Sequence, residues 1–393
     1  MSTRAVRAAR RLVTTFTVVG ALLAGGVSAA TPAPAAADST VDWSRAVVDA
    51  TLTRFPTPAS FGEWSHTRGL FLYGVYQVYR RTGEKRYLDY VRGWADLTVD
   101  AEGRLNTPLV QQNPMLPGSL LIALHAETGD VRYRKAADVI RARIAEYPRT
   151  SDGGMWYSSL TPGELWADSV YMAQPFLARY GKAYGDGKYA YDEAARNLLV
   201  TFKHLVAPNG LLFHAYDENG DASWGPHPVT HTSAVHWVRT IGWHSMALVD
   251  VLEVLPRNHP DRPKLIANLN ILARAFARFQ EPRTGRWFQV VDRGDDPDNW
   301  TETSGSAMYT YTLGKAVRLG LLPRYYDTVA RTGHRGVLAK VVKGADGLAN
   351  VLDTSEGTHP SDYQTYLSRR RMTNDLHGLA AFVVMNEQLT QRM

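Results

Sequence analysis

The sequence predicts an all-α protein in which paired helices close into a toroid of six hairpins, and three observations support this. Apolar residues recur at helical spacing along most of the 393-residue chain. Alternating apolar and polar stretches typical of strands are scarce. A turn in which one helix ends at glycine and the next begins with an early tyrosine is repeated. Hairpins of this kind cannot bury their apolar faces alone and must stack on neighbours.

The repeated turn appears first at Tyr79–Tyr87 and again at His125–Tyr133, with a looser third copy at Gly181–Tyr189. Each copy places glycine where a helix can stop and an acidic residue where the next can start. The interval between Gly83 and Gly129 has room for two helices and their loops, so the repeat unit is a helical hairpin.

Taken in chain order, helix-type patterns run almost without interruption to the C-terminus. Two apolar segments, 211–215 and 286–291, are predicted as short strands or extended loops. Because no linker divides the series, residues 40–393 are predicted to be one domain. The predicted helices lie at 41–54, 67–82, 84–99, 118–128, 130–147, 168–183, 187–206, 233–255, 261–281, 302–319, 324–341, 360–370 and 374–391.

The long connections are rich in aromatic residues, and alternate connections of a toroid meet at one mouth. Indole rings on such loops can stack on the apolar face of a sugar, although about half are expected to pack in the core instead. The connections are Pro56–His66, Asn106–Pro117, Thr150–Trp166, Pro208–Thr232 and Asp292–Thr301, with Trp64, Trp156, Trp166, Trp224 and Trp300 in or beside them.

Residues 1–37 have the pattern of a secretory signal peptide followed by an Ala/Pro linker. Four arginines precede the apolar stretch 12–27, and alanines follow it, with cleavage expected after Ala29, Ala30 or Ala37. A membrane anchor is the alternative, but it needs a longer apolar span. We therefore expect a secreted protein without stable membrane association, acting as a monomer or simple homo-oligomer.

Charge and cysteine content exclude several classes of function. The net charge of +6 comes largely from the arginines of the leader, so the remaining chain is near neutral and does not indicate a nucleic-acid partner. The chain has no cysteine, which excludes disulfides, thiolate metal sites and a cysteine nucleophile.

Asp168 is the most informative acidic residue, because it precedes an apolar helical pattern and follows Trp166. An Asp in this position often caps a helix through its carboxylate. A carboxyl group beside an indole can instead lose water and become an acid with a raised pKa. The residues alone favour the helix cap, and both interpretations stay open.

Several stretches in this order and spacing resemble the unsaturated rhamnogalacturonyl hydrolases of glycoside hydrolase family 105, with the unsaturated glucuronyl hydrolases of family 88 as distant kin. The resemblance covers nearly the whole chain after the leader and implies an (α/α)6 barrel. The stretches are Leu165–Asp168, Tyr171–Phe176, Phe213–His214, Trp237–Trp243, Met246–Leu252, Gly285–Asp292, Glu302–Ser304, Ser306–Met308 and Asn374–Gly378.

The resemblance implies an oligosaccharide substrate whose non-reducing uronic acid carries a C4=C5 double bond. An acid protonates C4, water adds at C5, and the resulting hemiketal releases the rest of the sugar chain. The resemblance assigns the acid to Asp168, and a carboxyl group dehydrated against an indole suits that task. No cofactor and no metal are expected.

Further residues are expected to bind the substrate, each with a structural alternative. Trp166 and Trp243 are expected to stack on sugar. His214 is expected to bind the sugar or orient water, or else to be a structural histidine. Arg239 suits a carboxylate, or else an internal ion pair. Met172 lines the expected pocket floor, although a methionine at helical spacing is usually core.

The sequence departs from the family pattern at three places. The stretch Gln111–Met115 lacks the Asp that the family places there, Trp156–Tyr157 stands where the family has Trp-His, and His66 stands where it has Tyr. Asn113 and Tyr157 can still hydrogen-bond sugar hydroxyl groups. We expect these changes to remodel the subsite, so that uronyl hydrolysis is more strongly indicated than rhamnogalacturonan as its source.

Two other functions remain open from the sequence. One is a glycosidase or lyase of the same fold that acts on saturated polysaccharide, and the other is a non-catalytic carbohydrate-binding protein, which the missing carboxylate near Asn113 allows. A metal site at His227, His231 and His236 is disfavoured because their spacing fits no ligand motif.

Overall fold

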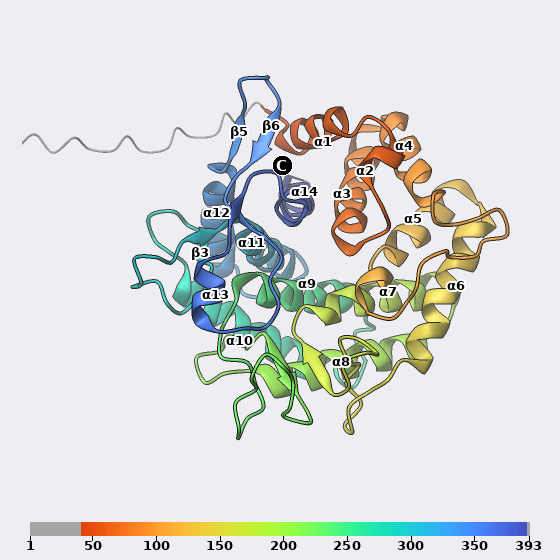
Figure 1. Ribbon diagram of the computed structural model, residues 1–393. Coiled ribbons are helices and arrows are strands. Elements are labelled where there is room, and N and C mark those ends of the chain that lie inside the picture. The colour runs from red at the N-terminus through yellow and green to blue at the C-terminus, as the bar shows by residue number, and fades with distance from the viewer. Residues whose placement is uncertain (1–40, 391–393) are drawn as a thin grey trace, which may run out of the picture. The chain divides into compact units, whose positions relative to one another are not determined.

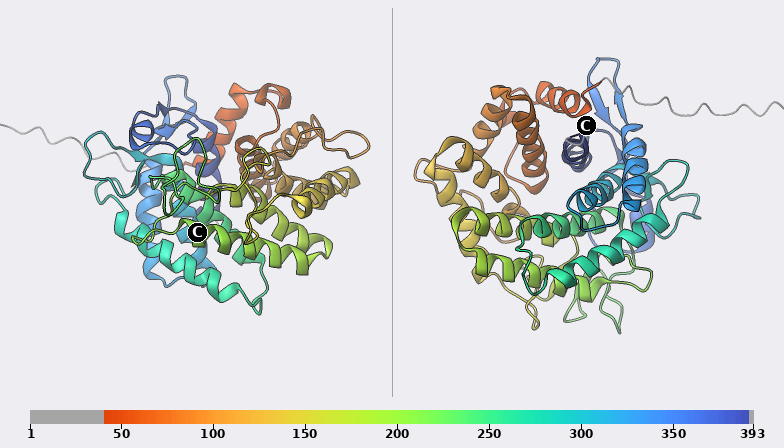
Figure 2. Two further views of the ribbon diagram at one scale, coloured as in Figure 1. Left: turned by 60° about the horizontal axis from the view of Figure 1, so that its bottom comes forward. Right: turned by 180° about the vertical axis from the view of Figure 1, so that it is seen from behind.

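Twelve long helices form two concentric rings in the computed structural model, which describes residues 41–390 (Figures 1 and 2). Each inner helix packs on the next, and the ring closes where the last contacts the first. This arrangement confirms the predicted (α/α)6 barrel. The inner ring is α3 (His66–Thr82), α5 (Gly118–Thr128), α7 (Ser169–Tyr184), α9 (Val238–Val254), α11 (Thr303–Arg318) and α14 (Leu376–Thr390), and the outer ring is α1 (Trp43–Arg54), α4 (Lys85–Ala95), α6 (Val131–Glu146), α8 (Gly187–Leu205), α10 (Arg262–Phe279) and α12 (Tyr325–Leu338).

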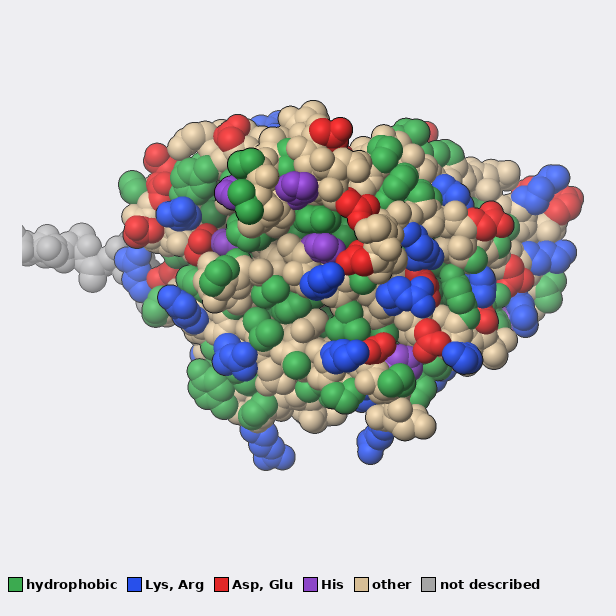
Figure 3. Space-filling model, turned by 90° about the horizontal axis from the view of Figure 1, so that it is seen from below, with side chains coloured by type: hydrophobic (Ala, Val, Ile, Leu, Met, Phe, Trp, Pro, Cys, Tyr) green, Lys and Arg blue, Asp and Glu red, His purple; other side chains and the backbone are tan. Residues whose placement is uncertain are grey.

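The leader predicted at residues 1–37 lies outside the described residues. No helix between residues 41 and 390 is long and apolar enough to cross a membrane. On the face drawn in Figure 3, acidic and basic side chains are interspersed and do not form a patch of one sign.

Inner and outer helices differ in how much of their circumference is buried. Every residue from Val238 to Leu252 in α9 and from Thr303 to Ala316 in α11 is buried, whereas α12 buries only one face. In a helix buried all round, Ser and Thr side chains can hydrogen-bond to the backbone of their own helix. In α11 the hydroxyl groups of Ser306 and Thr312 do so by donating to the carbonyl groups of Glu302 and Met308.

The repeated glycine turns make the short connections from inner to outer helices. Gly83, Gly129 and Gly185 adopt the left-handed conformation (φ of 74°, 70° and 84°) and end α3, α5 and α7, as the sequence predicts. The return connections, 55–65, 96–117, 147–168, 206–237, 280–302 and 339–375, are longer. All of them lead to the N-terminal ends of inner helices, so they gather at one mouth of the barrel.

Short strands stiffen the connections at the mouth. Strand β1 (Glu164–Trp166) pairs antiparallel with β2 (Ala215–Asp217), which sets Trp166 opposite Ala215. The other elements are β3 (Trp287–Phe288) paired with β4 (Thr301–Glu302), β5 (Val341–Lys343) with β6 (Ala349–Val351), β7 (Thr354–Ser355) with β8 (Arg371–Met372), and the short helices α2 (Pro58–Phe61), η1 (Asn113–Met115) and α13 (Tyr363–Leu367).

Several predicted boundaries were wrong. The helix predicted at 233–255 begins only at Val238, because Thr232 and Trp237 bridge to extended segments beside them. The helix predicted at 360–370 is limited to α13, and the one predicted at 84–99 ends at Ala95. The segments 211–215 and 286–291, predicted as short strands or extended loops, agree with this prediction, with Ala215, Trp287 and Phe288 in strands and the remaining residues in the connections.

Candidate active site

Asp168 lies between strand β1 and helix α7, in the N-cap position of the helix. The neighbouring Ala167 amide donates to the His214 carbonyl (2.9 Å), which fixes this segment beside the strand pair. The Asp168 side chain makes no capping hydrogen bond. Its Oδ1 atom is shielded from solvent and has no partner, while the residue as a whole is partly exposed. The helix-cap interpretation of this side chain was therefore wrong.

The surroundings of Asp168 favour the protonated carboxyl group. Burial raises its pKa from 3.8 to about 7, and the charge of Arg239 offsets only part of this effect. Hydrogen bonds from the backbone amides of Asp168 and Ser169 also lower the pKa, but a carboxyl group with a pKa near 7 carries a proton on about half of the molecules at neutral pH. The arrangement can thus supply a general acid and, after donation, a general base.

An aromatic stack borders Asp168 on its N-terminal side. The rings of Tyr157 and Trp166 lie face to face, 3.6 Å apart and at 1°. The indole N–H of Trp166 donates to Glu164 Oε2 (2.7 Å), and Trp224 donates to the same oxygen (3.1 Å). Glu164 is 9% exposed and fixes both indoles. Glu164 was not identified from the sequence. Residues two apart on a strand lie on the same face, and this spacing of Glu164 and Trp166 was the available signal.

His214 lies within the same cluster and is fully buried. Its Nδ1 pairs with the Tyr366 hydroxyl group (2.6 Å), while Nε2 has no partner. Burial lowers the pKa of His214 well below its usual value, so the ring is neutral. Its ring lies 5.6 Å from that of Trp166, and His359 packs against the same indole at 5.5 Å. Tyr366 and His359 were not identified from the sequence.

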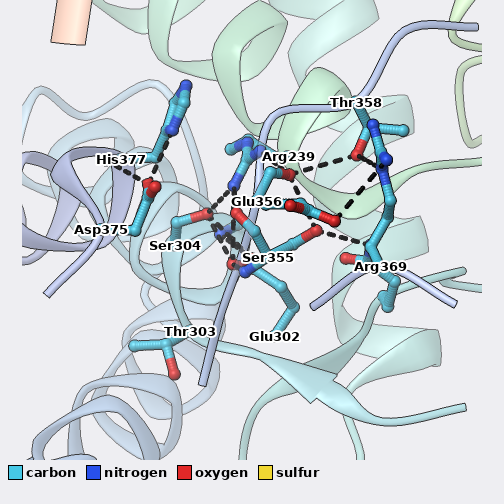
Figure 4. A network of polar contacts seen from close by, with 12 residues as sticks. Arg239, Glu302, Thr303, Ser304, Ser355, Glu356, Thr358, Arg369, Asp375 and His377 are labelled. Carbon is cyan, nitrogen blue, oxygen red and sulfur yellow. Dashed lines mark hydrogen bonds and ion pairs between the residues drawn. The ribbon is translucent and has the colours of Figure 1, made fainter. Parts of the chain in front are cut away.

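Arg239 is 1% exposed and holds the 339–375 connection in place (Figure 4). Its guanidinium group donates to the carbonyl groups of Ser355 (2.6 Å) and Glu356 (2.8 Å), and lies 3.9 Å from the Glu302 carboxylate. The buried ion pair considered as an alternative is therefore present. Arg239 also acts electrostatically on Asp168, whose pKa it lowers.

A second polar group borders Arg239. His66 lies beside His377 and Trp243, with ring centroids 5.5 and 6.3 Å away, and burial lowers its pKa to about 3. The Nδ1 atom of His377 lies 2.8 Å from Asp375. Although burial opposes the change, this hydrogen bond lowers the pKa of Asp375 to about 2.

Two residues that were predicted to contact the substrate lie in the interior of the barrel. Trp243 is 2% exposed and packs on Tyr171 at 4.9 Å. Met172 is also 2% exposed and belongs to the main hydrophobic core, in agreement with the core alternative for this residue.

The segment that departs from the family pattern lies beside Tyr157. The Tyr157 hydroxyl group is 3.4 Å from Gln111 Oε1. Burial raises the pKa of Tyr157, and Asn113, at the start of η1, partly opposes this through a side-chain hydrogen bond. Asn113 and Tyr157 are thus brought together next to Trp166.

The three clustered histidines are engaged separately. Amide groups donate to His227 Nδ1, while Nδ1 of His231 pairs with the Asp217 carbonyl and Nδ1 of His236 with that of Leu212. Within residues 41–390, no group of three or more His, Asp or Glu side chains is placed to hold a metal ion.

Comparison with known proteins gives matches over most of the chain. A family model described as Glycosyl Hydrolase Family 88 matches residues 43–392. The unsaturated rhamnogalacturonyl hydrolase YesR of Bacillus subtilis is 27% identical over 255 residues, which are 62% of this chain and 68% of that protein.

Solved structures give the same result. A glycoside hydrolase from family 105 of C. acetobutylicum superposes with a TM-score of 0.85 and 32% identity, over 89% of this chain and 100% of that one. An unsaturated glucuronyl hydrolase from Bacillus sp. GL1 has a TM-score of 0.66 over 87% and 94% of the two chains. At 17% identity, the second match speaks for the fold alone.

Proposed function

Because the chain belongs to the glycoside hydrolases of families 88 and 105, we propose that it removes the unsaturated uronic acid from the non-reducing end of lyase-generated oligosaccharides. The relative YesR, an unsaturated rhamnogalacturonyl hydrolase, supports this substrate class. The observation on which the proposal depends is the Asp168 carboxyl group, which lacks a partner at Oδ1 and has its pKa raised to about 7.

The reaction follows from the position of that proton. The C4=C5 bond of the substrate belongs to a vinyl ether, so protonation of C4 by Asp168 leaves positive charge on C5 and the ring oxygen. The Asp168 carboxylate then takes a proton from water as the water oxygen bonds to C5. The hemiketal opens and the aglycone leaves, with Asp168 protonated again.

The residues around Asp168 have supporting roles in this proposal. Neutral His214 can accept a hydrogen bond from water or sugar at Nε2, which has no partner in the protein. Trp166 is a stacking surface, Asn113 and Tyr157 bind hydroxyl groups, and His66 borders the sugar, whereas Trp243 and Met172 support the site from the barrel interior. Arg239 acts on the substrate carboxylate through its charge, while two of its N–H groups bind the carbonyl groups of Ser355 and Glu356.

The test is a screen of lyase-treated polysaccharides that follows loss of ultraviolet absorbance and a mass gain of one water. Absorbance loss with that mass gain is expected. Products from intact polymer without lyase treatment indicate the saturated-chain alternative, and binding measured by calorimetry without turnover indicates the carbohydrate-binding alternative.

We also propose that the enzyme is exported through residues 1–37 and works as a monomer or simple homo-oligomer without stable membrane association. The arginine-rich start and apolar stretch of that segment support export. N-terminal sequencing of secreted protein, with a start after Ala29, Ala30 or Ala37, tests the cleavage, and size-exclusion chromatography tests the assembly.

A further inference from the structure

A cavity of about 880 Å³ lies outside the Asp168 cluster. It opens between the 206–237 connection, the loop that follows β3 and helix α13. Its chemically distinctive lining consists of Phe213, His236, Asp292, Asp296, Arg293 and Tyr363.

The cavity and the Asp168 cluster share one wall. Phe213 lines the cavity, while the next residue, His214, contacts Trp166. His236 lines the cavity, while Trp237 packs on His214 at 5.0 Å. In extended backbone, successive side chains point to opposite sides, so these segments present alternate residues to the two sites. Helix α13 contributes to both sites as well, with Tyr363 in the cavity and Tyr366 on His214.

Two aromatic side chains of this shared wall, Phe213 and His236, line the cavity. The rings of Phe213 and His236 lie 4.5 Å apart at 35°. His236 is 7% exposed, and its Nδ1 pairs with the Leu212 carbonyl. Its Nε2 lies 3.8 Å from Asp292 Oδ2, within ion-pair range but beyond hydrogen-bond distance, so Nε2 can form a hydrogen bond to a ligand.

Carboxylates face the rings. Asp296 is oriented by the Tyr363 hydroxyl group (2.6 Å) and the Asp298 amide (2.9 Å), and Asp292 and Asp295 also line the cavity. Three carboxylates against the single guanidinium group of Arg293 give the cavity negative charge. Rings beside hydrogen-bond acceptors suit a ligand with apolar faces and many hydroxyl groups, and the charge disfavours an anion.

We propose that this cavity is a second carbohydrate site, which binds neutral sugar units back to back with the Asp168 cluster. A polysaccharide fragment held there keeps the enzyme near its substrate without offering the held sugar to Asp168. The proposal needs no turnover, so a binding measurement tests it separately from the hydration reaction.

The experiment is calorimetry with galactotetraose and cellotetraose as neutral probes and tetragalacturonate as the anionic one. We expect at least one neutral probe to bind the wild-type chain with a Kd of about 1 mM, and tetragalacturonate to bind at least several-fold more weakly at low salt. Phe213→Ala removes a ring and Asp295→Asn removes an exposed acceptor. We expect about a tenfold and about a threefold loss of affinity, respectively.

Asp298→Asn is the matched control, because Asp298 is an exposed carboxylate of the same loop that does not line the cavity. It should leave the affinity unchanged. If circular dichroism shows that Phe213→Ala disturbs the fold, the affinity of the Asp295→Asn variant still tests the proposal. Absence of binding by both neutral probes at about 10 mM, or binding that Asp295→Asn leaves unchanged, overturns the proposal.

Discussion

Asp168 and Asp250 are both aspartates of the inner helical ring, and desolvation acts on both carboxyl groups, but their partners differ. Asp168 begins α7 at the mouth and has no partner at Oδ1. Asp250 lies near the C-terminal end of α9, where it accepts hydrogen bonds from Arg179 (2.6 Å), Lys315 (2.6 Å) and Tyr311 (2.7 Å). Burial raises the pKa of Asp168 to about 7, whereas the two cations lower the pKa of Asp250 despite its burial.

The difference shows that burial alone does not make a carboxyl group an acid. Desolvation penalises the charged form at both positions, and the partners decide whether that penalty is offset. Asp250 is structural because its charge is compensated, and Asp168 can donate a proton because its charge is not. Substitutions at Asp168, Asp250 and Glu164 each remove one feature on which this contrast depends.

The largest expected effect is that of Asp168→Asn on activity. The amide has nearly the same shape but cannot donate the proton, so kcat/KM should fall by about 10³- to 10⁴-fold. Hydrolysis of an unsaturated disaccharide, followed by absorbance, measures the loss, with circular dichroism as the check of the fold. Full activity in this variant contradicts the assignment of the acid.

The corresponding substitution at the second aspartate, Asp250→Asn, should lower the free energy of unfolding. It leaves Arg179 and Lys315 buried without their shared carboxylate, which costs about 3–5 kcal/mol. Because the folded pKa of Asp250 is lowered, its contribution is present above the unfolded value near 4 and is lost as pH falls. Urea unfolding should therefore show a larger deficit at pH 7 than at pH 3, with Asp298→Asn as the exposed control.

The contrast also predicts that Asp168→Asn stabilises the protein. A carboxyl group whose folded pKa is raised costs stability above that pKa and nothing below its unfolded pKa near 4. The free energy of unfolding of the variant should therefore exceed that of wild type by about 4 kcal/mol at pH 8, with no difference near pH 4. A destabilised variant at pH 8 would show that the Asp168 carboxylate has a compensating partner.

A smaller effect is expected at Glu164, which positions Trp166 without touching Asp168. Glu164→Gln weakens the hydrogen bonds from both indoles by about 1–2 kcal/mol, so kcat should fall about tenfold. Glu164→Ala should lose more. The pH profile distinguishes positioning from a general loss of structure, because an indole that moves away exposes Asp168 to water and shifts the alkaline limb of the profile to lower pH.

The sequence predicted those features of the fold and of the Asp168 site that depend on residues close together in the chain. Helical spacing and the glycine stops predicted the barrel, and the Trp-x-Asp order placed a carboxyl group beside an indole, whereas the acid role of Asp168 came from the family resemblance. Tyr366 could not be found this way, because it reaches His214 across 152 residues of chain. Nor could the sequence decide whether Asp168 caps its helix, since that depends on the side-chain direction and on what surrounds the carboxyl group.

The most direct test of the account is the titration of Asp168 itself. The ¹³C chemical shift of its carboxyl carbon can be followed with pH in aspartate-labelled enzyme, with Asp168→Asn providing the assignment. The account predicts a pKa near 7 for Asp168 and, in the same spectra, a pKa for Asp250 that its cationic partners hold below the ordinary value of an aspartate. A pKa near 4 for Asp168 would contradict it, because the carboxyl group would then hold no proton to donate at neutral pH.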